Sequence, residues 1–271
     1  MLVLSLFPGI DLLGRGFELE DFAVVRGPDL IFGGDIRAFH PPAGRFDGVI
    51  GGPPCQDFSS LRRCEPSGNG VAMLAEFVRC VECASPSWFL MENVPGVPDI
   101  APVGYRVQRF DLRANECGLP QQRLRHFQFG SNCDEVLLLN RDARTAVTQC
   151  CATAAEGTRT ARRGWAEFCE SQGLHADFDL PGFTLAAKYR AVGNGVPIPM
   201  GRFVARAIKD ARYPAQLITL CVCGCGRSVS GQQTYALPAC RKRMQRRRDA
   251  AQDTDSRRDT AMHMRSHERA A

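Results

Sequence analysis

Residues 46–56 read FDGVIGGPPCQ, in which a short apolar run is followed by two glycines, two prolines and a cysteine. The run has the composition of a buried strand, and the Gly and Pro residues predict that it ends in a tight loop. A thiol at the end of such a strand is either buried filler or a nucleophile held at the edge of a sheet. The surrounding sequence has to decide between these two interpretations.

The same succession of strand and turn recurs along the first hundred residues. Apolar runs that begin at residues 2, 22 and 87 each end in Gly or Pro, and helical spacing of apolar residues is found at 12–20 and 70–85. Strands that alternate with helices predict a doubly wound, largely parallel α/β sheet. Ligands of such sheets bind at the carboxyl ends of the strands.

The pattern changes beyond residue 100. Residues 105–131 read as two strands around a Gly-Leu-Pro turn, which predicts an antiparallel pair that closes the sheet. Residues 131–165 show little periodicity, and we interpret them as a short irregular insertion. Helical patterns follow at 164–174, 185–196 and 200–211, and we expect these helices to return to the sheet.

Composition indicates an ordinary globular protein with one main core, since the chain has 271 residues and 44% hydrophobic side chains. Its apolar runs are much shorter than the roughly 20 residues of a bilayer span, and no secretory pattern opens the chain. We therefore expect a cytoplasmic protein with no membrane partner. The 13 cysteines are odd in number, which favours free thiols and a metal site over disulfides.

Positive charge is concentrated at one end of the chain. The net charge is +5, and residues 241–271 hold ten basic and five acidic side chains, so the first 240 residues are neutral. The stretch RKRMQRRR at 241–248 is either a solvated tail or an arm that binds phosphates. We favour the arm if the rest of the chain acts on nucleic acid.

Five short motifs occur in order along residues 1–210: LFPGI, GGPPCQ, MENV, QQRLR and GNGVP. Their order and approximate spacing resemble those of cytosine-5 DNA methyltransferases, and the short segment between the last two is similar to compact, phage-like members. The resemblance implies a Rossmann-like S-adenosylmethionine-dependent methyltransferase fold. It also implies that residues 131–165 are a short target-recognition insertion.

The resemblance assigns catalytic roles to four side chains. Cytosine C5 becomes nucleophilic once a thiolate adds to C6, and Cys55 matches the family's nucleophile. Glu92 matches the glutamate that engages N3 and the exocyclic amine of the base. Arg123 and Arg125 match the arginines that hold the target base and the cysteine loop. A structural thiol, a salt-bridged carboxylate and a solvated strand face are the alternatives.

The resemblance also implies that S-adenosyl-L-methionine binds near the first strand. Ser5 stands where the family has an acid and Asp11 where it has a second glycine, and we infer that the two residue types have exchanged places. The residues expected to contact the cofactor are Phe7, Gly9, Asp11, Asp29, Asp35, Pro53, Asn194 and Val196. Asp29 and Asp35 are alternatively explained as ordinary turn residues, and the glycines beside Asn194 as the end of a helix.

Four cysteines gather near the carboxyl end: Cys221, Cys223, Cys225 and Cys240. Four thiolates suit tetrahedral zinc, although the C-x-C-x-C spacing is tighter than the usual C-x-x-C, so three or all four are ligands. We expect a methyltransferase domain over residues 1–213 and a zinc-ribbon-like module over 214–248. A disordered tail is expected over 249–271.

The sequence thus predicts a monomeric enzyme that methylates cytosine C5 in double-stranded DNA after the base leaves the helix. One alternative is an RNA cytosine-5 methyltransferase with the same site, and a preference for RNA over DNA as substrate would distinguish it from the DNA enzyme. A catalytically silent nucleic-acid-binding protein is another, and cofactor binding discriminates that one.

Overall fold

The computed structural model describes residues 1–59, 65–141, 144–211, 220–229 and 233–249. The chain divides into two compact units, residues 1–217 and residues 218–271. The tail predicted over 249–271 lies outside the described residues from residue 250 onward. Within the described ranges, no helix has the length and apolar character that crossing a membrane requires.

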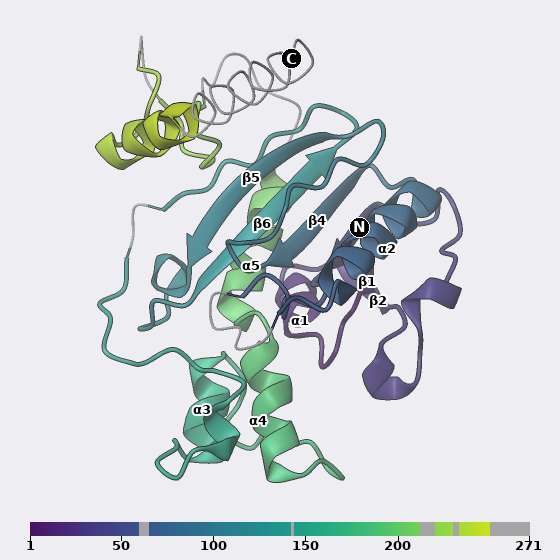
Figure 1. Ribbon diagram of the computed structural model, residues 1–271, viewed down its shortest axis with the longest axis vertical. Helices are drawn as coiled ribbons and strands as arrows, with labels where there is room; N and C mark the ends of the chain where they lie inside the picture. Colours follow the sequence, from purple (N-terminus) through teal and green to yellow (C-terminus); the bar gives the residue numbers. More distant parts are fainter. Residues whose placement is uncertain (60–64, 142–143, 212–219, 230–232, 250–271) are drawn as a thin grey trace, which may run out of the picture. The chain divides into compact units, whose positions relative to one another are not determined.

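The first unit is built on a six-stranded sheet with the order β2-β1-β3-β4-β6-β5. The first four strands pair in parallel, β6 runs antiparallel to β4, and β5 runs antiparallel to β6 (Figure 1). The predicted α/β sheet with its closing antiparallel pair is therefore confirmed. The strands are β1 (Leu2–Leu6), β2 (Ala23–Arg26), β3 (Gly48–Gly51), β4 (Trp88–Asn93), β5 (Arg106–Arg113) and β6 (Leu124–Ser131).

Helices cover both faces of this sheet. One face packs against α1 and α5, through side chains such as Phe17 and Val204, and the other packs against α2, through side chains such as Phe77. Burying each large apolar side chain contributes about 1.5–3 kcal/mol to this sandwich. The helices are α1 (Leu12–Glu18), α2 (Asn69–Ala84), α3 (Trp165–Ser171), α4 (Leu185–Asn194) and α5 (Ile198–Asp210).

Two of the three late helices do not return to the sheet, contrary to the sequence prediction. α3 and α4 form a separate cluster in which the ring of Phe168 lies 4.6 Å from that of Tyr189, and Trp165 packs against both rings. These aromatic side chains bury one another, so the two short helices need no strand to cover their apolar faces. Only α5 packs on the sheet, beside α1.

The parallel strands bring the sequence motifs to one edge. Leu6 of β1 lies opposite Gly51 of β3, and Gly51 lies opposite Met91 of β4. The loops that follow these three strands therefore emerge side by side at the carboxyl end of the sheet.

Candidate active site

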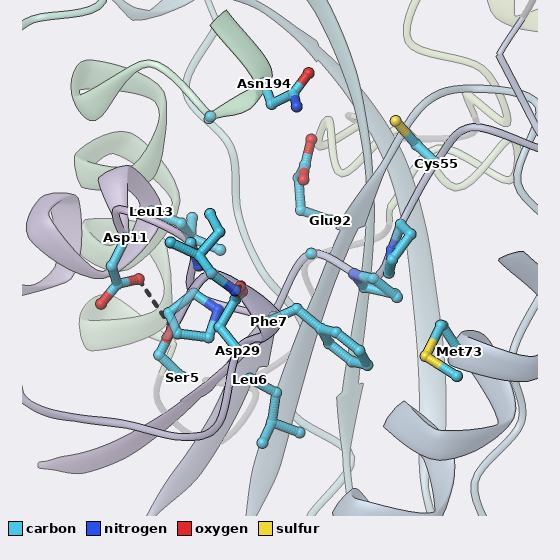
Figure 2. Close-up of a pocket in the computed structure, with 18 of the residues that line it drawn as sticks. Ser5, Leu6, Phe7, Asp11, Leu13, Asp29, Cys55, Met73, Glu92 and Asn194 are labelled. Carbon is cyan, nitrogen blue, oxygen red and sulfur yellow. Dashed lines mark hydrogen bonds between the residues drawn. The ribbon is translucent and has the colours of Figure 1, made fainter. Parts of the chain in front are cut away.

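A cavity of about 340 Å³ lies at this carboxyl edge. Its walls come from the ends of β1, β3 and β4, from the loops after β1 and β2, from β6 and from the end of α4. In Figure 2, Cys55, Glu92 and Asn194 lie toward one end of the cavity, and Asp11 and Asp29 lie toward the other. Eleven of the twelve catalytic and cofactor residues predicted from the sequence line it, and Arg123 is the exception.

The cysteine loop after β3 is held from two directions. The side-chain amide of Asn93, the last residue of β4, donates to the carbonyl of Pro53 at 2.9 Å, and the Phe58 amide donates to the carbonyl of Cys55 at 3.0 Å. A Cβ at Gly52 would lie 2.9 Å from Glu92 Oε2. A larger residue at position 52 would have to displace that carboxylate. The loop is thus fixed against the end of the neighbouring strand.

Glu92 and Arg125 form a mostly buried pair beside this loop. Arg125 Nε lies 2.8 Å from Glu92 Oε1, with side-chain exposures of 14% and 11%. Burial raises the pKa of the Glu92 carboxyl above its ordinary value, although Arg125 opposes the shift. The glutamate is therefore biased toward a state that can donate a proton or a hydrogen bond.

The Cys55 thiol is partly buried in the same environment. Burial raises its pKa above the ordinary value, the Glu92 charge raises it further, and Arg125 acts in the opposite direction. A buried thiol with a raised pKa is protonated near neutral pH, and its thiolate fraction depends on the balance of these two charges.

Arg123 is directed away from the cavity, into the segment that follows β6. It is buried and donates to the carbonyls of Ala152, Gly193 and Gly195, the last two at 2.6 and 3.0 Å. Burial lowers its pKa to about 9. Arg125 thus contacts Glu92 directly, whereas Arg123 acts on Glu92 and Cys55 only through its charge, which opposes the rise in the pKa of both.

At the other end of the cavity, Ser5 and Asp11 are in direct contact. Ser5 Oγ donates to Asp11 Oδ1 at 2.9 Å, the Gly14 amide donates to the same oxygen at 3.0 Å, and Arg26 Nε lies 2.9 Å from Asp11 Oδ2. The carboxylate therefore caps α1. Burial raises the pKa of Asp11 despite these partners.

The loop from Phe7 to Asp11 has an uncommon backbone. Phe7, Gly9 and Asp11 have positive φ angles of 52°, 53° and 55°. Two of them are not glycines, and such backbone strain concentrates at ligand sites. Asp29 supports the loop, because its Oδ2 accepts from the Gly9 amide at 2.8 Å and its Oδ1 accepts from the Ile31 amide at 2.9 Å.

Asp35 lines the same end of the cavity but already has a basic partner. Arg37 Nη2 lies 2.6 Å from Asp35 Oδ2, and this pairing lowers the pKa of Asp35. The sequence prediction missed Arg37 and also Leu30 and Ile31, which line the cavity. The apolar triplet Leu-Ile-Phe directly after Asp29 could have indicated an apolar wall of the cavity. Leu30 is 76% exposed in the structure, so its side chain is available to a ligand.

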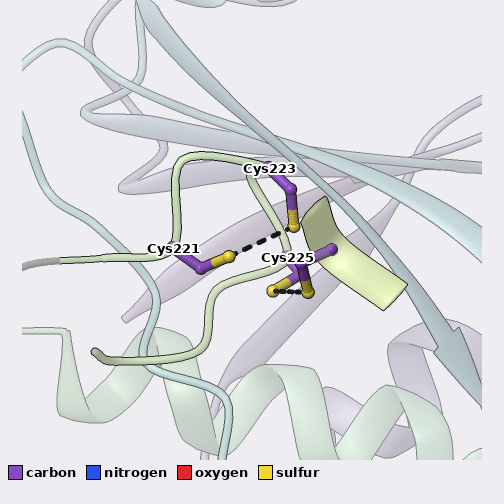
Figure 3. A group of neighbouring side chains, drawn as sticks. Cys221, Cys223 and Cys225 are labelled. Atoms are coloured by element: carbon purple, nitrogen blue, oxygen red, sulfur yellow. Dashed lines mark hydrogen bonds between the residues drawn. The ribbon is translucent and has the colours of Figure 1, made fainter. Parts of the chain in front are cut away.

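In the second unit, the four predicted cysteines converge. All four Sγ atoms lie within 4.8 Å of one another, with 3.4 Å between Cys221 and Cys223 and 3.9 Å between Cys225 and Cys240. Figure 3 shows the side chains of Cys221, Cys223 and Cys225 directed at one another. Four sulfurs around one zinc ion, each about 2.3 Å from it, lie about 3.8 Å apart. The cluster has the size that a tetrahedral ion requires.

The backbone around the cluster is folded as a tight turn followed by a helix. Cys221 donates its amide to the Arg227 carbonyl at 2.9 Å, and Gly224 and Gly226 have positive φ angles of 76° and 73°. Residues 238–249 are helical, so Cys240 lies in the first turn of that helix. All twelve cysteines in the described part of the chain are free thiols.

Residues 32–153 match the family model described as C-5 cytosine-specific DNA methylase. The type II methyltransferase M.DdeI of Desulfomicrobium norvegicum is 36% identical over 107 residues, which are 34% of this chain and 26% of that protein. The type II methyltransferase M.FnuDI of Fusobacterium nucleatum is 30% identical over 167 residues, which are 49% of this chain and 48% of that protein. The chain thus spans at most about half the length of these two relatives.

A likeness to solved structures supports the fold. The structure of the Entamoeba histolytica methyltransferase EhMeth superposes with a TM-score of 0.58 at 12% sequence identity. The superposition covers 78% of this chain and 98% of that chain.

Proposed function

We propose that this chain, whose residues 32–153 match the family model of C-5 cytosine-specific DNA methylases, methylates cytosine at C5 in double-stranded DNA, with S-adenosyl-L-methionine as donor. The observation that carries the proposal is the gathering of Cys55, Glu92 and Arg125 on one cavity that also contains the residues expected to bind the cofactor. This arrangement unites a nucleophile, an acid and a cation, which addition to a cytosine ring requires.

The residues at the far end of the cavity fit S-adenosyl-L-methionine. Asp29 and Asp35 offer carboxylate oxygens, Leu30 and Ile31 offer apolar surface, and the loop around Gly9 brings backbone close to the cavity. These are the groups that a nucleoside with a charged substituent requires. When bound there, the donor supplies an electrophilic methyl group to C5, and its sulfur keeps the electron pair of the broken bond.

The chain's own residues prepare and release the base. Cys55 as thiolate adds to C6 of a cytosine turned out of the duplex, the C5–C6 π electrons shift to form a C4–C5 double bond, and the C4–N3 π electrons move onto N3. Glu92 gives a proton or hydrogen bond to N3, which accepts that charge, and Arg125 holds the Glu92 carboxyl in place. After methylation, a base takes the C5 proton, the electrons of the C5–H bond form the C5–C6 double bond again, the Cys55 thiolate leaves with the C6–S electron pair, and N3 returns its proton to Glu92.

We favour DNA over RNA as the substrate because the description of the matching family model names DNA. We also disfavour a silent binding protein, since Cys55, Glu92 and Arg125 all line the cavity. Incubation with labelled donor and either duplex DNA or RNA of the same sequence separates the three. Labelled DNA supports the proposal, labelled RNA supports the first alternative, and no labelling with no cofactor binding supports the second.

Trapping tests the nucleophile. A DNA duplex with 5-fluorocytosine at the target position should become covalently attached in the presence of the donor, because fluorine at C5 blocks the final elimination. Cys55→Ala should abolish the adduct, and Cys83→Ala, a partly buried thiol of α2, should keep it. An adduct with Cys55→Ala would reject the assignment of this residue.

We also propose that Cys221, Cys223, Cys225 and Cys240 hold a structural zinc ion. The size of the sulfur cluster supports this, as does the Ala236 amide, which donates to Cys221 Sγ at 3.3 Å as amides do to thiolates in metal sites. Metal analysis of protein purified under reducing conditions should find about one zinc per chain. Cys240→Ser should lower that content, and Cys169→Ser in α3 should not; equal zinc in both would overturn the proposal.

The division of labour along the chain is part of the same proposal. We assign the methyltransferase domain to residues 1–213, with 131–165 as its target-recognition insertion, and the metal module to 214–248. We propose that the enzyme acts as a monomer.

A further inference from the structure

We propose that the helix formed by residues 238–249 binds the phosphates of duplex DNA without regard to sequence. The inference rests on the proposed function for the choice of DNA, and on the second unit alone for the binding surface. It assigns a partner to a charged helix for which the methyl-transfer chemistry has no use.

The helix carries an unusual density of free positive charge. Six basic side chains lie within eight residues, all six are exposed, and no acidic side chain pairs with them in the described part of the chain. They are Arg241, Lys242, Arg243, Arg246, Arg247 and Arg248. The nearby carboxylate of Asp249 accepts instead from Gln245, at 2.7 Å. These charges repel one another, so a folded helix that keeps them gains from an anionic partner.

The cysteine cluster fixes which side of the helix faces solvent. Cys240 joins the first turn to the cluster, and Met244, one turn later, packs against the same cluster. At 100° per residue, Cys240 and Met244 share one face, which the exposed Arg247 continues one turn later, and the other five basic side chains spread over the remaining surface. The rotation of the helix is therefore set by its packing, and the basic surface is presented outward.

The spacing of these charges matches that of duplex DNA. Residues 241–248 extend about 10 Å along the helix axis, at 1.5 Å per residue. A DNA duplex carries one negative charge per about 1.7 Å of its axis, or about six over the same length. The density of positive charge along the helix is thus comparable to the density of negative charge along the duplex.

The composition of the helix argues against a membrane surface as the partner. Helices that lie in a bilayer interface present Trp, Phe or Leu on the face opposite their basic residues. Here the opposite face consists of Cys240 and Met244, which are directed into the cysteine cluster. The helix offers lipid no free apolar face, and a polyanion remains as the partner.

The test compares two double variants of the full-length protein, each of which removes two positive charges. Arg243→Gln/Arg246→Gln lies on the helix. The matched control, Arg45→Gln/Arg106→Gln, changes exposed residues near the amino ends of β3 and β5, away from the cavity. Fluorescence anisotropy measures affinity for a 30-base-pair duplex over a range of salt concentrations, without methyl donor.

The helix variant should bind more weakly, and the slope of log affinity against log salt should decrease in magnitude by about 1.8, that is about 0.9 per lost phosphate contact. The control should keep the slope of the unmodified protein, and both variants should retain their zinc. An unchanged slope in the helix variant, or an equal change in the control, would overturn the proposal. So would a larger effect on a duplex RNA of the same length.

Failure of the proposed function would look different. Because the assay needs no methyl transfer, a protein that never methylates DNA can still lose salt-dependent affinity in the helix variant. Conversely, an active enzyme whose helix variant keeps both the slope and the KM for DNA would refute the helix assignment alone.

Discussion

Replacing Arg123 by methionine separates a structural role for this arginine from a role on the substrate. Its guanidinium donates to the carbonyls of Ala152, Gly193 and Gly195, and through them ties the segment after β6 to the start of that strand. Methionine keeps most of the side-chain volume and removes every donor. The three carbonyls then lose a buried, charged partner.

The expected cost can be worked from these contacts. Hydrogen bonds to a charged group contribute about 1.5–3 kcal/mol each, and a buried carbonyl left unpaired costs about 1–3 kcal/mol. Because the three bonds share one donor and the segment can relax, we expect a combined loss of about 3–5 kcal/mol rather than the sum. Arg123→Lys should recover part of it, since an ammonium group cannot reproduce the planar fork of a guanidinium.

Tryptophan fluorescence during urea unfolding measures this loss in the relevant unit, because both tryptophans, Trp88 and Trp165, belong to residues 1–217. With a urea dependence of about 3 kcal/mol per molar, the midpoint of Arg123→Met should fall by about 1–1.7 M. The control Arg190→Met, an exposed position of α4, should change stability by less than about 0.5 kcal/mol. If Arg123→Met behaves like this control yet loses methyl transfer, the arginine acts on the substrate and the reasoning is wrong.

Three further changes test the cavity itself. Glu92→Gln removes a charge that raises the pKa of Cys55, so iodoacetamide should label Cys55 several-fold faster at pH 8, by about tenfold per unit of pKa. With either residue at position 92, the labelling rate should rise with pH. Peptide mass spectrometry reports labelling at this site, and slower labelling of the variant would contradict the electrostatics. Gly52→Ala puts a Cβ 2.9 Å from Glu92 Oε2, so the rate of methyl transfer should fall at least about tenfold while the free energy of unfolding changes by less than about 1 kcal/mol. An unchanged rate of methyl transfer would show that the loop does not fix the carboxylate. Ser5→Asp/Asp11→Gly should be more stable than the two single changes predict, by about 1 kcal/mol, because the side chains are in contact; additive unfolding energies would argue against an exchanged pair.

The sheet could be predicted because its signals are local. Each strand is a short apolar run that ends in Gly or Pro, and parallel pairing then brings Cys55 and Glu92 to the same edge. The contact between Ser5 and Asp11 was not predicted, although it is compatible with the inferred exchange of residue types in the family's first motif.

What the sequence did not predict depends on partners far along the chain. Arg123 stands just before β6, so the alternation that would place it beside Arg125 does not apply, and its acceptors are 29 to 72 residues away. The aromatic cluster of α3 and α4 is a similar case, because helical periodicity shows that a face is apolar without showing what covers it. Leu30 was missed because an exposed apolar side chain has no periodic signal.

The acceptors of Arg123 are all main-chain carbonyls, and those of Gln121 and Gln172 include the carbonyls of Ser171 and Val192. A main-chain carbonyl is present at every position whatever the side chain, so these hydrogen bonds depend on the path of the backbone and not on the identity of the residues. Exposed side chains along the segment between residues 153 and 171 can therefore change while the cavity keeps the same main-chain support. In the proposed target-recognition insertion, residues 131–165, we accordingly expect variation in specificity to accumulate at exposed positions rather than at the packed aromatic side chains.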